Sequence, residues 1–411
     1  MIINKSASNK KLKNNILALG NEAAKAKKAD PEVINGTSGM LKNEDGTLYE
    51  FECVKKAVAS LTSAEKYAYT NSGGTKTFSE AVYYSLFGKY LKDIRDSAFI
   101  KCIPTPGGSG ALSISFFNYL EPGETILLPN HMWENYLSIA NEAGINTDTY
   151  QLFYEEDEFD FNDLSKKINA LKNKQNRIMI LINDPCENPT GFCMKEKDYD
   201  ELINIAKNDP NHNYIYLVDV AYFDFYNVNP DIIRSRFAKF KDIPDNALAL
   251  FIFSGSKSFG LYGLRIGALV ALSKSEEEAE LFKEANSYSS RARWSAPSTL
   301  GISIIEKLVL DENNRETYEE ELKFVCAMLE KRSLAFLESA KEVGLKTLPY
   351  ERGFFICVPC KDPNKIMEAL HQDKVHVVST KSCLRIALCA ISKEEAARLP
   401  RIIKNRLDKE E

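Results

Sequence analysis

The stretch of this chain with the most information is Phe253-Ser254-Gly255-Ser256-Lys257-Ser258-Phe259-Gly260-Leu261-Tyr262-Gly263-Leu264-Arg265-Ile266-Gly267. An apolar segment, Ala247 to Phe253, ends where small hydroxylated and glycine residues begin. Lys257 follows, and Arg265 lies eight residues beyond it. A lysine serves as a covalent catalyst when its amine is partly desolvated, because the neutral amine can form a Schiff base with a carbonyl.

Read alone, Lys257 fits a solvated surface charge better than a catalyst, because the chain has 53 Lys and Arg residues. Its neighbours favour a site. The small residues leave room for a flat ring, and Ser254, Ser256 and Arg265 can bind an anion. The stretch therefore describes a pocket for pyridoxal 5'-phosphate (PLP), which has an aldehyde at one end and a phosphate at the other.

A glycine-rich turn supplies a second part of this pocket. A predicted strand, Phe99 to Ile103, runs into Pro104-Thr105-Pro106-Gly107-Gly108-Ser109-Gly110-Ala111-Leu112. If this segment opens a helix, Gly108, Ser109 and Gly110 present free backbone N–H groups and a hydroxyl at the positive helix end, which suits a phosphate. A plain tight turn is the alternative.

A third segment, Tyr214 to Tyr222, reads as a buried strand that ends at Asp219. This carboxylate can pair with a protonated pyridine nitrogen and so make the ring an electron sink. The alternative is an aspartate that caps a helix. Tyr222 lies three residues on and can reach the 3-hydroxyl of the ring.

A fourth segment is Arg177-Ile178-Met179-Ile180-Leu181-Ile182-Asn183-Asp184-Pro185-Cys186-Glu187-Asn188-Pro189-Thr190-Gly191. Again a predicted strand ends in polar and turn-forming residues. The Asn188 amide can donate to the ring oxygen or to a substrate carboxylate.

Together these motifs resemble a known family. Their order is Gly-Ser-Gly, Trp, Asn-Pro-Thr-Gly, Asp-x-Ala-Tyr, Ser-x-Ser-Lys, Arg and a late Arg, collinear from Gly36 to Leu388. This order resembles the fold type I, class I aminotransferases, near the aspartate and aromatic aminotransferase branch.

The resemblance implies a role for each matching residue. Lys257 would be the Schiff-base lysine and proton shuttle, and Asp219 would pair with the pyridine nitrogen. The implied cofactor contacts are Gly108, Ser109, Gly110, Ser254, Ser256 and Arg265 around the phosphate, Asn188 and Tyr222 at the 3-hydroxyl, and Trp133 and Ala221 on the two ring faces.

The resemblance also implies contacts with substrate and with a second subunit. Arg385 would bind the substrate α-carboxylate through a bidentate fork, Gly39 would close on it with a backbone N–H, and Trp133 and Asn188 would also contact the substrate. Tyr69 resembles the tyrosine that reaches the phosphate of the neighbouring subunit, which implies a homodimer with shared active sites. Tyr67 is the alternative for that role.

Two departures from the family pattern bear on substrate and tuning. Ser303 stands where the dicarboxylate-specific members have an arginine, so Arg291 and Arg293 are the nearby candidates to replace it. Tyr136 stands where relatives often have a histidine that supports the ring aspartate.

Composition agrees with a soluble enzyme. The net charge of −5 gives no electrostatic reason to expect nucleic acid. Nine scattered cysteines and four dispersed histidines predict no metal site and a reducing cytoplasm. Met1 to Lys13 lacks an apolar region, and no run approaches membrane-spanning length.

The pattern along the chain predicts an α/β fold with a mostly parallel sheet in a large PLP-binding domain and a smaller α+β domain. We place the large domain at 51–315 and the small C-terminal domain at 316–411, joined by an N-terminal arm at 1–50. The large-domain strands are predicted at Phe99–Ile103, Thr125–Leu128, Ile178–Asn183, Tyr214–Val220, Ala247–Phe253 and Arg265–Leu272. The small domain should contain a long helix at Glu316–Val343 and strands at Gly353–Val358, Val375–Val378 and Cys383–Leu388.

The sequence therefore predicts a PLP-dependent aminotransferase (transaminase) of amino-acid metabolism that works by a ping-pong mechanism. We expect an aromatic or bulky neutral L-amino acid as donor and a 2-oxo acid such as 2-oxoglutarate as acceptor, with an aspartate aminotransferase as the alternative. A β-lyase or decarboxylase would share every cofactor residue and stays open. A PLP-sensing regulator is disfavoured, because about 35 residues before Gly36 are too few for a DNA-binding domain.

Overall fold

The computed structural model describes residues 2–3, 5–8, 10, 16–155 and 157–410, so part of the Met1 to Lys13 stretch lies outside it. The chain forms two compact units. The small unit comprises the described residues up to Thr47 together with 332–348 and 356–410, and the large unit comprises the described residues of 48–331 and 349–355. Residues 316–331, which we expected in the small domain, cluster with the large unit, because the Tyr318 ring packs on Phe51 and Phe259.

A seven-stranded sheet forms the centre of the large unit, with strand order β2-β10-β9-β8-β7-β3-β4. Every neighbouring pair is parallel except the two that involve β10, which is antiparallel to both β2 and β9. The sheet strands are β2 (Phe99–Thr105), β3 (Thr125–Pro129), β4 (Asn146–Tyr150), β7 (Arg177–Asn183), β8 (Asn213–Asp219), β9 (Ala247–Ser254) and β10 (Gly267–Ser273), and a separate hairpin joins β5 (Phe153–Tyr154) to β6 (Glu158–Phe159).

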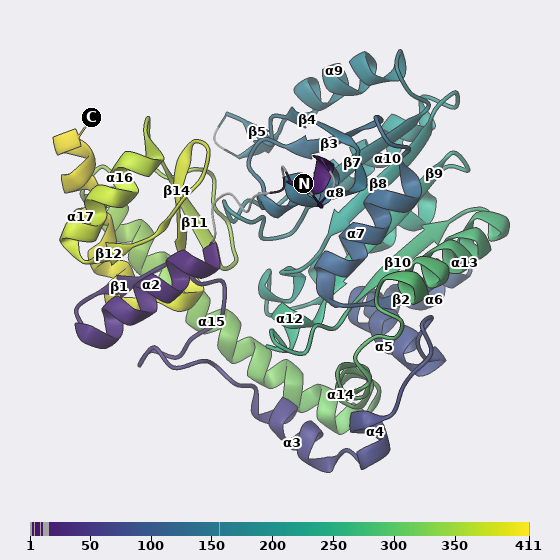
Figure 1. The fold of residues 1–411 in the computed structure, drawn as a ribbon, viewed down its shortest axis with the longest axis horizontal. Helices are drawn as coiled ribbons and strands as arrows, with labels where there is room; N and C mark the ends of the chain where they lie inside the picture. The colour runs from purple at the N-terminus through teal and green to yellow at the C-terminus, as the bar shows by residue number, and fades with distance from the viewer. Residues whose placement is uncertain (1, 4, 9, 11–15, 156, 411) are drawn as a thin grey trace. The chain divides into compact units, whose positions relative to one another are not determined.

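The central strands are apolar along their whole length because both faces of the sheet are covered. Every residue of β9 and β10 is buried. Helix α7 packs against β9 and β10, and α13 packs against β2 and β10 (Figure 1). The mostly parallel α/β architecture expected from the sequence is confirmed.

Helices precede, connect and follow these strands. The α-helices are α3 (Glu52–Ser60), α4 (Ser63–Tyr67), α5 (Lys76–Phe87), α6 (Leu91–Arg95), α7 (Gly107–Tyr119), α8 (Asn135–Ala143), α9 (Phe161–Lys172), α10 (Glu196–Lys207), α11 (Asp231–Ala238), α12 (Gly255–Ser258), α13 (Glu276–Arg293), α14 (Thr299–Leu310) and α15 (Glu312–Glu342). Short 3₁₀ turns are η1 (Gly88–Tyr90), η2 (Phe223–Phe225) and η3 (Lys239–Asp242).

One edge of the sheet collects the ends of several strands. Strand β7 ends at Asn183, which is in register with Asp219 at the end of β8. Strand β10 begins at Gly267, which is in register with both Thr105 at the end of β2 and Ser254 at the end of β9. Residues that follow these ends in sequence are therefore brought to the same edge, where open α/β sheets bind ligands.

The small unit contains a three-stranded sheet of order β11-β14-β13 and a parallel pair of β1 and β12. Its strands are β1 (Ile34–Asn35), β11 (Phe355–Pro359), β12 (Val375–His376), β13 (Val378–Ser379) and β14 (Cys383–Ala387). Its helical segments are α1 (Lys5–Ser8), α2 (Ile16–Ala29), α16 (Pro363–Leu370), η4 (His371–Asp373), η5 (Leu388–Ala390), α17 (Lys393–Glu410) and the end of α15.

Over the described part of the chain, no helix has the length and apolar character needed to cross a membrane. Within the same residues, no group of three or more His, Cys, Asp or Glu side chains is placed to hold a metal ion.

The start of β10 predicts a sharp sensitivity to side-chain volume. A Cβ at Gly267 would lie 2.5 Å from the Phe253 carbonyl oxygen and 2.7 Å from the Gly107 carbonyl carbon. Gly267→Ala should therefore lower the free energy of unfolding by about 1–3 kcal/mol, as overpacking does. Urea unfolding measures this loss. Gly263→Ala is the matched control, because a Cβ there meets nothing within 4 Å. Equal unfolding midpoints for the two variants would contradict the close approach.

Candidate active site

Lys257 lies in the short helix α12, directly after β9, and its side chain is partly buried. Its Nζ lies 5.1 Å from the ring centroid of Tyr262, 5.6 Å from that of Tyr222 and 5.9 Å from that of Phe354. Three aromatic rings thus border the amine. Among these neighbours only Tyr222 was expected. Tyr262 and Phe354 were missed, because a Tyr after a glycine-rich turn and a Phe about 100 residues downstream carry no local signal.

Groups that suit an anion converge beside α7. The N-cap residue of this helix, Pro106, makes no side-chain hydrogen bond to its first turn, so no capping side chain occupies the N–H groups of Gly108 and Ser109. A Cβ at Gly107 would lie only 2.7 Å from Nη2 of Arg265, which shows how closely that guanidinium approaches the turn.

Arg265 is held in place by its own loop. It adopts a left-handed backbone conformation with φ 53°, and its Nη1 donates to Ser256 Oγ and to the Tyr262 carbonyl oxygen, each at 3.0 Å. A Cβ at Gly108 would lie 3.6 Å from the Ser254 Cβ. The predicted anion-binding residues therefore lie together.

Asp219 is the acidic group of the candidate site. Its carboxylate is buried, accepts a hydrogen bond from Tyr136 Oη at 2.7 Å and a second from the Ala221 N–H at 3.1 Å. Burial raises the pKa of the Asp219 carboxyl to about 6, although both hydrogen bonds act to lower it. A cation beside this carboxylate would relieve the cost of burying its charge.

Asn188 and Tyr222 are also brought together. The Asn188 backbone N–H donates to Asn183 Oδ1 at 2.9 Å, and its Nδ2 lies 3.5 Å from Tyr222 Oη. Asn183 in turn donates to the Asp219 carbonyl oxygen at 2.8 Å. The loop that carries Asn188 is thus tied to the end of β8, which places an amide and a phenol next to each other.

Aromatic and small residues complete this edge. Trp133 packs edge-on against Tyr136, with ring centroids 5.5 Å apart and an interplanar angle of 87°. The Tyr136 ring therefore contacts both residues, since it packs against Trp133 and its hydroxyl donates to the Asp219 carboxylate. Ala221 is partly buried two residues after Asp219.

The donor set fits PLP in charge and chemistry. An uncapped helix start with Arg265 suits a phosphate, an amine at Lys257 suits an aldehyde, and a buried carboxylate at Asp219 suits a protonated pyridine nitrogen. These are three different groups, and each matches one functional group of the same molecule.

Arg385 and Gly39 belong to the small unit. Arg385 lies in β14, is 5% exposed, and its Nη2 donates to the Thr37 carbonyl oxygen at 2.9 Å. Gly39 follows two residues after Thr37. Within this unit, the predicted carboxylate-binding arginine and the predicted backbone donor are therefore connected through one short segment.

The remaining predicted residues lie on the large unit. Tyr69, between α4 and α5, is 95% exposed, and Tyr67 is 80% exposed. Ser303 is buried and its Oγ donates to the Glu65 carbonyl oxygen at 3.1 Å. Arg291 donates to Ser295 Oγ at 2.8 Å.

Arg293 lies over a neighbouring aromatic ring. Its guanidinium carbon is 4.5 Å from the ring centroid of Phe117, and its Nη1 is 3.5 Å from Ser113 Oγ. Both partners are on α7. The two candidate replacement arginines thus already have contacts of their own within the large unit.

Comparison with known proteins identifies the family. The model of the aminotransferase class I and II family matches residues 31–403. The chain is 27% identical over 309 residues to a mitochondrial aspartate aminotransferase of Dictyostelium discoideum, which covers 74% of this chain and 70% of that protein. It is 28% identical over 340 residues to an aromatic-amino-acid aminotransferase of Escherichia coli, covering 80% and 83%.

A solved structure shows the same fold across the whole length. The aminotransferase of Anaerococcus prevotii has a TM-score of 0.94 at 29% identity, with 99% of this chain and 100% of that chain covered. The extent of the family match and the groups assembled at the sheet edge agree. The chain belongs to the class I and II aminotransferases and is a PLP-dependent enzyme of that family.

Proposed function

We propose that this aminotransferase moves an amino group between an L-amino acid and a 2-oxo acid such as 2-oxoglutarate by a ping-pong mechanism. One observation carries the proposal. An amine at Lys257, a buried carboxylate at Asp219 and an anion site at Arg265 meet at one edge of one sheet. The second half-reaction is the reverse of the first, so the same residues serve both.

Lys257 is the covalent attachment point and the acid–base group. PLP, when bound, withdraws electrons from the substrate α-carbon and so makes its proton removable. Lys257 Nζ would take the α-proton of the amino donor as a general base and would return a proton as a general acid. The rings of Tyr222, Tyr262 and Phe354 around Nζ limit access of water to the amine during this transfer.

The other large-unit residues bind and orient the cofactor. Asp219 would hold a protonated ring nitrogen, since a buried carboxylate is most stable beside a cation. Asn188 and Tyr222 would hold the 3-hydroxyl group, and Trp133 and Ala221 would contact the two ring faces. The proposed phosphate contacts are Gly108, Ser109, Gly110, Ser254, Ser256 and Arg265.

The substrate α-carboxylate binds to Arg385. A guanidinium offers two parallel N–H donors that match a carboxylate. Because Arg385 Nη2 is already fixed by the Thr37 carbonyl oxygen, its plane has a defined orientation. The Gly39 N–H supplies a further donor, and Trp133 and Asn188 also contact the substrate.

We infer an aromatic or bulky neutral donor rather than an acidic one. An acidic side chain needs a cation, because an unpaired buried carboxylate is strongly disfavoured. Ser303 cannot supply that charge, and its hydroxyl is bonded to the Glu65 carbonyl oxygen. Arg291 and Arg293 keep aspartate as the second candidate, and the relatives include enzymes with either name.

The assembly we propose is a homodimer with shared active sites. Tyr69 would reach the phosphate of the partner, and its side chain is almost fully exposed in the single chain. We also propose a cytoplasmic location, because none of the nine cysteines, all of which lie in the described residues, forms a disulfide. Large-domain residues 51–315, small-domain residues 316–411 and the arm at 1–50 remain our proposed functional division.

The covalent role of Lys257 can be tested by trapping. Lys257→Ala should bind PLP without the absorbance of the lysine-linked cofactor, lose borohydride labelling at that position, and turn over at least about 10³-fold more slowly. Absorbance, mass spectrometry of the reduced protein and a coupled transaminase assay measure these three effects. Lys89→Ala, an exposed lysine paired with Asp231, is the control. Undiminished labelling in Lys257→Ala would remove Lys257 from the reaction.

The charge of Asp219 should appear in the pH dependence of stability without cofactor. The pKa of Asp219 is about 6 in the folded chain and about 3.9 in the unfolded chain. The favourable contribution of the protonated Asp219 to the free energy of unfolding is therefore present in full below about pH 4 and is lost as the pH rises through about 6. This loss amounts to about 3 kcal/mol. Asp219→Asn cannot ionise and should lack it, as urea unfolding at both ends of this range would show.

Added PLP distinguishes the site from burial in general. Burial also raises the pKa of Asp224 to about 6. PLP should suppress the fall in the free energy of unfolding that the ionisation of Asp219 causes, because the protonated ring nitrogen would pair with the Asp219 carboxylate. PLP should leave the corresponding fall caused by Asp224 unchanged. The same PLP response in Asp219→Asn and Asp224→Asn would contradict the pairing.

Donor specificity can be read from kcat/KM. We expect phenylalanine or tyrosine to exceed aspartate by about tenfold or more, because the aspartate side chain would lack a cation. Arg291→Ala and Arg293→Ala should change the value for aspartate by less than about threefold. A preference for aspartate that disappears in either variant would show that one of these arginines replaces the missing clamp.

A further inference from the structure

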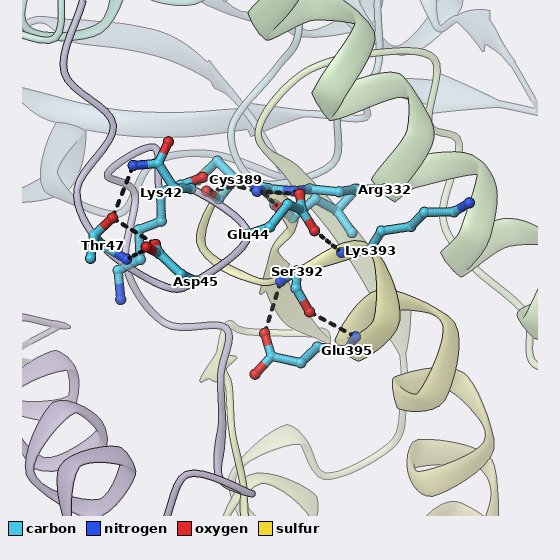
Figure 2. Close-up of polar contacts among 11 residues, drawn as sticks. Lys42, Glu44, Asp45, Thr47, Arg332, Cys389, Ser392, Lys393 and Glu395 are labelled. Atoms are coloured by element: carbon cyan, nitrogen blue, oxygen red, sulfur yellow. Dashed lines mark hydrogen bonds and ion pairs between the residues drawn. The ribbon is translucent and has the colours of Figure 1, made fainter.

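Arg332 is a fully buried arginine in the small-unit part of α15, with 0% exposure. Its guanidinium makes five contacts with four residues (Figure 2). Nε and Nη2 donate to Glu44 Oε1 at 2.9 and 2.7 Å, Nη2 donates to the Lys42 carbonyl oxygen at 2.9 Å, and Nη1 donates to the carbonyl oxygens of Cys389 at 3.1 Å and Leu388 at 3.4 Å.

These partners lie on two segments that run beside each other. One is segment 36–44, and the other is β14 with η5. Their backbones are joined by Ala387 N to Gly36 O and by Lys42 N to Cys389 O, each at 2.9 Å. Cys389 Sγ also lies 3.5 Å from the Ser38 carbonyl oxygen. Arg332 binds both segments where this pairing ends.

The same pairing contains the proposed carboxylate-binding residues. Arg385 donates to the Thr37 carbonyl oxygen. Thr37 is itself fixed, since its N–H and hydroxyl donate to Asn35 Oδ1 at 3.2 and 2.6 Å. Gly39 lies between Ser38, which Cys389 contacts, and Lys42, which Arg332 contacts. The orientation of Arg385 and the position of the Gly39 N–H both depend on where this segment lies.

We propose that Arg332 is a positioning residue for substrate binding, which fixes segment 36–44 against η5 and thereby orients Arg385 and Gly39 toward the substrate α-carboxylate. The inference rests on the proposed role of Arg385. Arg332 contacts neither substrate nor cofactor in this arrangement and acts through the backbone carbonyl oxygens that it joins.

An arginine is required by the geometry of the acceptors. The planar guanidinium has five N–H donors in a fixed fork, whereas a lysine ammonium is a compact charge with three. A lysine at 332 would therefore keep the charge beside Glu44 but leave part of the carbonyl set without a donor. Glu44 extends the network, because its Oε2 accepts from the Lys393 N–H at 2.8 Å at the start of α17 (Figure 2).

The test measures ligand binding as well as turnover. Arg332→Met, Arg332→Lys, Arg385→Leu and the double variant Arg332→Met/Arg385→Leu are compared with the parent, all loaded with PLP. The probe is 3-phenylpropionate or succinate, whichever the parent binds more tightly, and its Kd is followed by calorimetry. Arg398→Met is the control, because that exposed side chain is paired at 3.3 Å with Glu32 on the surface.

We expect Arg332→Met to raise the probe Kd and the KM of the amino acid about tenfold, with kcat changed by less than about threefold. Arg332→Lys should show a smaller rise in the same two constants. PLP retention should be unchanged in both. Turnover of an amine without the α-carboxylate, such as 2-phenylethylamine, should not change, since it does not use the clamp. The probe Kd of the double variant Arg332→Met/Arg385→Leu should equal that of Arg385→Leu.

Three outcomes would overturn the proposal: an unchanged probe Kd in folded Arg332→Met and Arg332→Lys, an equal loss with the amine, or effects of Arg332 and Arg385 that add independently. If Arg332→Met fails to fold, Arg332→Lys carries the comparison. An unchanged probe Kd in Arg385→Leu would instead reject the carboxylate clamp itself, so failure of the proposed function is distinguishable from failure of this inference.

Discussion

The Asp219 carboxylate lies at the end of a strand that is buried from Tyr214 onward, and among the described residues it accepts hydrogen bonds from a phenol and a backbone amide. Neutral donors reduce the cost of burying a carboxylate without supplying a charge. The raised pKa of Asp219 is the direct consequence. A buried acid of this kind is most stable beside a cation, and a pyridine nitrogen that becomes protonated is such a partner.

The sheet explains why the other reactive groups lie near this carboxylate. Strands β7, β8 and β9 are parallel, so the loops after them emerge at one edge and carry Asn188, Tyr222 and Lys257 there. The antiparallel strand β10 starts at the same edge, so Arg265 just before it approaches the first turn of α7. Reversal of one strand thus brings a cation to a helix start that already favours anions.

The small unit adds a different kind of organisation. Its proposed clamp, Arg385, lies on β14, which is paired with the segment that carries Gly39. This pairing ends at the buried guanidinium of Arg332, which joins four residues. A paired and fully hydrogen-bonded buried arginine is costly to replace, because the partner carbonyl oxygens lose their donors. Such a network restricts the orientation of the groups that it joins, and a displacement of about 1 Å is enough to weaken a bound geometry strongly.

Local pattern was sufficient for the apolar strands, the glycine-rich turn and the residues that follow them, because strand ends and helix starts are encoded by neighbours in sequence. It missed β4, whose residues Asn146–Tyr150 are polar because this strand lies at the sheet edge. Only the tertiary structure showed the reversed direction of β10 and the Arg332 network, whose partners lie up to 290 residues away. These features depend on which distant segments pack together, and a single sequence contains no local periodicity that records such packing.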